Sequence, residues 1–104
     1  MDPVIERLYN TLLEKKHADP ANSYVASLYH KGVNAIVKKI GEETTEVIIA
    51  AKENHDSALI YEISDLLFHC LVLLASRDLS PEEVIQELKR REGVSGIKEK
   101  AARN

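Results

Sequence analysis

Five acidic side chains, gathered in two short clusters, have the types and spacing of a metal site: Glu42, Glu43, Glu46, Glu62 and Asp65. At about 100° per residue, Glu43 falls on the apolar stripe of its expected helix and Glu46 at the edge of that stripe, whereas Glu42 projects further toward solvent. Glu62 and Asp65 share one face of the next helix, which is otherwise apolar almost all round. Acids in these core positions are expected to be buried or to line a cleft.

Carboxylates buried close together are destabilised by desolvation and by mutual repulsion, unless cations neutralise them or some of them take up protons. Mg²⁺ prefers oxygen ligands and keeps positions for water and phosphate oxygens, whereas the sequence lacks the paired Cys and His spacing of a zinc site. We therefore expect Glu43, Glu46, Glu62 and Asp65 to bind Mg²⁺. Solvated surface charge is the alternative, and it stays most open for Glu42. His69 is expected to be a hydrogen-bonded packing residue rather than a ligand.

Helical periodicity dominates the rest of the chain and predicts one all-α domain over residues 1–104. The expected helices span residues 3–16, 23–30, 33–53, 58–76 and 81–91, with a polar tail after them. Asp2 before Pro3, Asn22 or Ser23, Asp56 or Ser57, and the capping box of Ser80 and Glu83 are the expected helix starts, and Gly32 marks a break. The fold class is a bundle of four to five helices.

Composition limits the possible partners and location. Seventeen acidic and fourteen basic residues give a net charge of -3 without a long basic block, so no affinity for nucleic acid is expected. Residues 58–75 approach the length of a membrane span, but Glu62, Asp65 and His69 interrupt them, which indicates a buried helix and no membrane insertion. The first residues lack the apolar core of a secretory signal, so a cytoplasmic protein is expected. The apolar segment 58–75 needs more cover than so small a domain can give it, which predicts a homodimer.

The acidic clusters also carry a family resemblance. Glu42-Glu43-x-x-Glu46 followed by Glu62-x-x-Asp65 resembles the signature of the MazG-like all-α nucleotide pyrophosphohydrolases. The runs KKIGEETTEVIIAAK and EISDLLFHCLVLLA resemble, more narrowly, the phosphoribosyl-ATP pyrophosphatase family of histidine biosynthesis. Further matches lie at Asp19-Pro20, Ser23-Tyr24 and Ser95-Gly96, so that the resemblance covers nearly the whole chain. Val25 departs from it, because the family usually has threonine there.

The resemblance implies a homodimer that hydrolyses phosphoribosyl-ATP to phosphoribosyl-AMP and pyrophosphate with Mg²⁺. Glu42 and Glu43 would be the catalytic carboxylates, with Glu42 as candidate general base. Lys39 and Ser23 are the expected substrate contacts, although a lone lysine is as often a solvated surface residue. Two alternatives stay open. One is a related pyrophosphohydrolase acting on dCTP, dUTP or damaged nucleotides, and the other is a non-catalytic helical dimerisation module.

Overall fold

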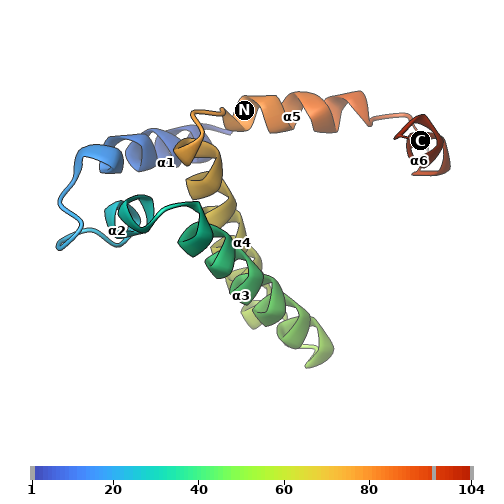
Figure 1. Ribbon diagram of the computed structural model, residues 1–104. Coiled ribbons are helices and arrows are strands. Elements are labelled where there is room, and N and C mark those ends of the chain that lie inside the picture. Colours follow the sequence, from blue (N-terminus) through green and yellow to red (C-terminus); the bar gives the residue numbers. More distant parts are fainter. Residues whose placement is uncertain (1, 95, 104) are drawn as a thin grey trace.

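The computed structural model describes residues 2–94 and 96–103, and these residues form helices joined by turns (Figure 1). Ser95, part of the tail motif in the sequence, lies outside the described residues. The helices are α1 (Pro3–Glu14), the short 3₁₀ helix η1 (Lys15–His17), α2 (Tyr24–Lys31), α3 (Val33–Lys52), α4 (Asp56–Ser76), α5 (Pro81–Arg90) and α6 (Gly96–Arg103). The predicted all-α class is confirmed.

Side-chain caps fix three of the helix starts as the sequence predicts. The Asp2 carboxylate accepts a hydrogen bond from the Val4 N–H at 2.8 Å, and the Ser23 hydroxyl accepts one from the Ala26 N–H. Ser80 and Glu83 form a complete capping box. These bonds satisfy backbone donors that the first turn of a helix leaves without a partner.

The start of α4 differs from the prediction of Asp56 or Ser57 as the cap. His55 is the N-cap, and its Nδ1 accepts a hydrogen bond from the Ala58 N–H at 3.2 Å. The helix therefore begins two residues before the predicted position 58. Histidine is an uncommon N-cap, so the preference for Asp and Ser pointed to the residues just after it.

The turn between α3 and α4 arranges them as an antiparallel pair, visible in Figure 1 as two long helices side by side. Asn54 has a φ of 56°, the left-handed conformation that ends many helices. Its N–H bonds the Ala51 carbonyl, and the His55 N–H bonds the Ala50 carbonyl. Three residues, 53–55, therefore reverse the chain with the Ala50 and Ala51 carbonyls satisfied. The helices α3 and α4 pack together more extensively than any other pair of helices.

The core lies where α1, α2, the first half of α3 and the second half of α4 meet. It is centred on the side chains of Leu12, Leu28, Ile36, Val72 and Ala75. The sequence predicts that α4 needs partners on every side, with a second subunit supplying part of the cover, and within one chain α4 is only partly buried. Ile60 and Tyr61 are each 68% exposed and Leu67 is 58% exposed, because α1 and α3 cover only one side of α4.

Two further features follow from this open arrangement. The Cα radius of gyration is 15.8 Å, whereas a compact domain of this length has about 13 Å. The helix α4 is also long and apolar enough to cross a membrane by length and composition alone, a test that core helices of soluble proteins pass as well.

The end of the chain departs from the predicted polar tail. Beyond Gly93, α6 forms from residues that mostly favour helix, and with it the described residues contain six α-helices where four to five were predicted. Figure 1 shows α5 and α6 leading away from the core, with α6 at the far end. Because α6 has few apolar residues, the stripe by which the other helices were recognised is missing.

Candidate metal and substrate site

Antiparallel packing of α3 and α4 brings together two of the predicted metal ligands. Glu43, Asp65 and His69 each offer a ligand atom, and these atoms lie within 4.8 Å of one another. Glu43 and His69 are buried, and Asp65 is half-buried. The apolar stripes of the two helices predict the inward position of Glu43 and Asp65, since the neighbouring turns carry core residues such as Ile36 and Val72.

The surroundings of Glu43 disfavour its negative charge. Its pKa is raised above the ordinary value, mainly by desolvation and then by the hydrogen bond and the negative charge of Asp65. The ammonium of Lys39 opposes this shift, because its Nζ lies 3.5 Å from Glu43 Oε1 and 3.4 Å from Glu42 Oε2. One lysine shared between two carboxylates does not cancel the unfavourable terms, so the cluster favours additional positive charge.

His69 is held by both ring nitrogens. Its Nδ1 lies 2.8 Å from the backbone carbonyl of Asp65, and its Nε2 lies 2.8 Å from the hydroxyl of Tyr24. A carbonyl oxygen only accepts hydrogen bonds, so Nδ1 carries a proton, and in this neutral tautomer Nε2 accepts the hydrogen bond from the Tyr24 hydroxyl. This agrees with the expected hydrogen-bonded role. It also leaves His69 without a free lone pair, so carboxylate oxygens remain as the donors of the cluster.

Tyr24 is a site residue that reasoning from helical spacing missed. Its ring packs edge-to-face on His69, with the ring centroids 5.8 Å apart. Burial and the nearby acids raise the pKa of its phenol, against the opposing effect of Lys39, so the hydroxyl stays protonated. Because this proton is used on His69, Tyr24 Oη faces other groups only as an acceptor. The pairing of Ser23 with Tyr24 in the family resemblance was the available signal.

The remaining predicted residues lie around this centre rather than in it. Glu42 is exposed beside Lys39, Glu46 is exposed, and Glu62 is half-buried. Glu46 and Glu62 are not among the three residues that converge within 4.8 Å. Ser23 caps α2 with its oxygen lone pair, which leaves the hydroxyl proton able to bind an acceptor.

Val25, where the resembling family usually has threonine, is buried in the core. A hydroxyl at this position would need a hydrogen-bond partner there, whereas valine packs against its neighbours without one.

An all-α chain whose two central antiparallel helices bring carboxylates and a lysine together has the architecture of an all-α pyrophosphohydrolase with a candidate metal centre. The family model described as phosphoribosyl-ATP pyrophosphohydrolase matches residues 5–92. The chain belongs to this family.

Individual relatives agree with the family model over nearly the whole chain. The chain is 57% identical over 100 residues to phosphoribosyl-ATP pyrophosphatase of Trichlorobacter lovleyi, which covers 96% of this chain and 93% of the relative. It is 52% identical over 103 residues to the protein of that name from Geobacter sulfurreducens, covering 99% and 95%. The Neisseria gonorrhoeae protein of the same name is 49% identical over 102 residues, covering 98% and 95%.

Proposed function

We propose that this protein hydrolyses phosphoribosyl-ATP to phosphoribosyl-AMP and pyrophosphate, the second step of histidine biosynthesis. The observation that carries the proposal is the convergence of Glu43 and Asp65 on adjacent helices of a chain that belongs to the phosphoribosyl-ATP pyrophosphohydrolase family. Hydrolysis of a phosphate anhydride needs positive charge beside the phosphates and a carboxylate beside the attacking water. The acidic cluster supplies the carboxylate, and its negative charge attracts a cation.

The donor set fits Mg²⁺. Glu43 and Asp65 present carboxylate oxygens, and both nitrogens of His69 are engaged, which suits a hard cation rather than zinc. Glu43 and Asp65 would hold the ion, with Glu46 and Glu62 as the further ligands proposed from the sequence. Bound there, Mg²⁺ supplies neutralisation of phosphate charge and polarisation of the scissile anhydride.

The chain's own groups then divide the remaining tasks. Lys39 is one-third exposed and remains charged, because Tyr24, Glu42 and Glu43 raise its pKa although burial alone would lower it. When another cation neutralises the carboxylates, Lys39 is free to turn to a substrate phosphate. Glu42 is exposed and beside the centre, so it is the candidate base for the attacking water. The Ser23 hydroxyl can donate its proton to a phosphate oxygen.

We further propose that the active form is a cytoplasmic homodimer. Exposed Ile60, Tyr61 and Leu67 lie on α4, and an apolar groove of about 370 Å³ runs between α1, α4 and α5. At about 25 cal/mol per Å² of apolar surface removed from water, a second copy covering this face gains substantial free energy. The radius of gyration, large for this length, fits a subunit that completes its core in a dimer.

Pyrophosphate release tests the proposal and its two alternatives together. Purified protein is incubated with phosphoribosyl-ATP, dCTP, dUTP and an oxidised nucleotide, with Mg²⁺ or with EDTA. We expect Mg²⁺-dependent release from phosphoribosyl-ATP, lost in Glu43→Gln and Asp65→Asn. Turnover of dCTP or dUTP without phosphoribosyl-ATP supports the related pyrophosphohydrolase, and a folded dimer inactive on every substrate supports the dimerisation module.

A further inference from the structure

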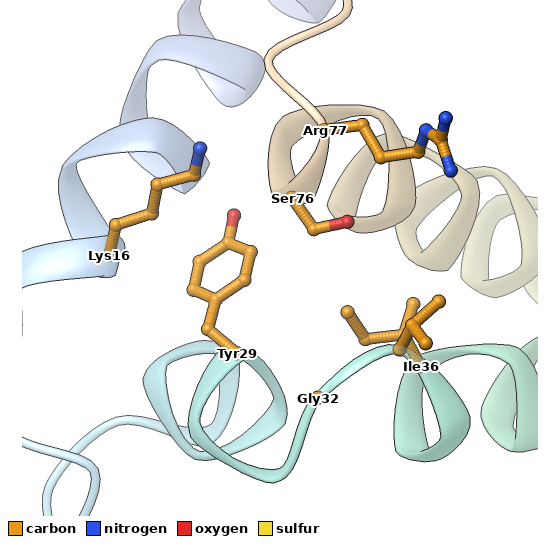
Figure 2. Close-up of a pocket in the computed structure, with 7 residues that line it drawn as sticks. Lys16, Tyr29, Gly32, Ile36, Ser76 and Arg77 are labelled. Carbon is orange, nitrogen blue, oxygen red and sulfur yellow. The ribbon is translucent and has the colours of Figure 1, made fainter.

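A second pocket (Figure 2) lies at the end of the α3 and α4 pair that is farther from the turn at Asn54. The acidic cluster lies about halfway along both helices. The volume of the pocket is about 440 Å³, and its wall comes from η1, α2, the start of α3 and the end of α4. Its lining residues include Lys16, Tyr29, Ile36, Ser76 and Arg77. Nothing in the proposed hydrolysis uses this pocket.

The charged side chains of the pocket wall are both cationic. Lys16 and Arg77 come from segments far apart in the sequence, and Figure 2 shows Lys16 on one side of the pocket and Arg77 on the other. No ion pair joins Arg77 to another described residue. The Arg77 guanidinium extends away from Lys16 in Figure 2. A ligand that binds both side chains must therefore change the Arg77 rotamer. In a chain with a net charge of -3, a pocket with two cations in its wall indicates an anionic ligand.

One acid competes for this charge from outside the pocket. Asp78 Oδ1 lies 2.6 Å from Lys16 Nζ, but the Asp78 side chain is 81% exposed. An ion pair so open to water is weak and screened by salt. A phosphate dianion that reaches Lys16 and Arg77 together can therefore displace Asp78 from Lys16.

Two hydroxyls in the wall have already donated their protons to the backbone. Tyr29 donates to the Leu12 carbonyl at 2.8 Å, and Ser76 donates to the Leu73 carbonyl at 2.6 Å. Burial raises the pKa of Tyr29 to about 12, so the phenol stays neutral. Both oxygens can still accept a hydrogen bond. The pocket thus offers cations to an anion and acceptors to hydroxyl groups, a combination that matches a sugar phosphate.

The position of the pocket matches a substrate with phosphates at two ends. Ile36 and Glu43 lie on the same face of α3, about 10 Å apart along the helix axis. Ser76 and Asp65 lie on the same face of α4, about 16 Å apart along that axis. Phosphoribosyl-ATP carries its triphosphate at one end and the phosphoribosyl group at the other.

We propose that this pocket binds a ribose phosphate group, with Lys16 and Arg77 on the phosphate and the Tyr29 and Ser76 oxygens on the ribose hydroxyls, and that it holds the phosphoribosyl end of the substrate. The assignment to the substrate rests on the proposed function. It makes the pocket the site that distinguishes phosphoribosyl-ATP from other nucleoside triphosphates.

Binding measurements test the pocket without relying on catalysis. The dissociation constants of phosphoribosyl-AMP and of pyrophosphate with Mg²⁺, which carries no ribose, are measured by calorimetry for the parent, Arg77→Ala and Lys16→Ala. Each variant is expected to weaken phosphoribosyl-AMP about tenfold, the lower range for a hydrogen bond to a charged group, and to leave pyrophosphate unchanged. Arg7→Ala and Lys15→Ala are matched controls, because they remove the same charge from exposed positions outside the pocket wall.

Asp78→Asn is expected to change the affinity for phosphoribosyl-AMP in the opposite direction. It frees Lys16 from its competing carboxylate, and asparagine tolerates the left-handed φ of 56° at this position. We expect tighter binding of phosphoribosyl-AMP and a lower KM for phosphoribosyl-ATP with kcat unchanged. A fold defect caused by changes at this pocket would weaken binding, so it cannot produce this result.

Three outcomes overturn the proposal. One is equal loss of affinity for phosphoribosyl-AMP and for pyrophosphate in Arg77→Ala, and another is no loss for either. The third is binding of ribose 5-phosphate that depends on Arg77 while KM for phosphoribosyl-ATP does not, which would make the pocket a separate anion site. Failure of the proposed function looks different, because the parent protein would then release no pyrophosphate from phosphoribosyl-ATP.

Discussion

Replacement of Glu43 by glutamine is predicted to stabilise the protein without metal and to remove its response to Mg²⁺. Two carboxylates with oxygens no more than 4.8 Å apart repel by roughly 3 kcal/mol or more at an effective dielectric constant of about 20. The Lys39 pair offsets part of this, but the Lys39 side chain is one-third exposed, which limits the pair to about 1 kcal/mol. The net gain for Glu43→Gln is on the order of 1–2 kcal/mol, or roughly 5–10 °C in Tm for a domain of this size.

The pH dependence of this gain has a definite sign. Because the pKa of Glu43 is raised in the folded state, the folded protein holds the proton more tightly than the unfolded chain. The contribution of Glu43 to stability is therefore largest below its unfolded pKa and is lost as the pH rises through the folded pKa. The advantage of Glu43→Gln should accordingly be present at pH 8 and should disappear in acid, below the ordinary range of a glutamate.

Thermal unfolding at pH 8 in EDTA and in excess Mg²⁺ measures both effects. Mg²⁺ at a hundred times its dissociation constant adds about 2.7 kcal/mol to the parent, which reverses the order of the two proteins. Glu53→Gln is the matched control, because Glu53 is the exposed C-cap of the same helix. A Glu43→Gln variant less stable than the parent in EDTA, with an unchanged shift in Mg²⁺, would refute the reasoning.

Three further predictions concern other parts of the structure. Tyr24→Phe removes the donor to His69 and should lower the unfolding free energy by about 1 kcal/mol; in the parent, long-range ¹H–¹⁵N NMR should show the Nδ1–H tautomer, and a dominant Nε2–H form would contradict the assignment. His55→Asn supplies a better N-cap to α4 and should raise stability by about 0.5 kcal/mol in denaturant titration. Leu67→Glu places a charge on the exposed face of α4 and should convert the proposed dimer to a monomer by light scattering, while a persistent dimer would locate the interface elsewhere.

Local chemistry allowed most of the helix boundaries to be predicted. Asp2, Ser23 and Ser80 combine a good capping side chain with a following helical pattern, and each caps a helix in the structure. The turn that contains Asn54 likewise lies between the expected helices 33–53 and 58–76. His55 shows the limit of this reasoning, since the cap with the best intrinsic preference was not the one that the geometry of the turn selected.

Burial was harder to predict than helix, because an apolar sequence does not say which chain covers it. Residues of α4 such as Ile60 and Leu67 are as apolar as Val72, yet only Val72 is buried within one chain. The apolar pattern shows which residues should be buried, and the fold of a single chain determines how many of them are buried without a partner. The contact of Tyr24 with His69 was beyond the sequence for a similar reason, because it depends on where α2 crosses α4.

Helix geometry explains why Glu46 and Glu62 lie beside the pair of Glu43 and Asp65 and do not converge with it. Glu46 stands three residues after Glu43 and Glu62 three residues before Asp65, so each is rotated about 60° from the converging pair and lies one turn along its helix. Because α3 and α4 are antiparallel, both displacements lead toward the turn at Asn54, and Glu46 and Glu62 reach the same level of the helix pair. Spacing alone therefore predicts a second pair of carboxylates beside the first. In the proposed site, exposed Glu46 would bind a cation at lower desolvation cost, while buried Glu43 would fix where the charge of that cation is most needed.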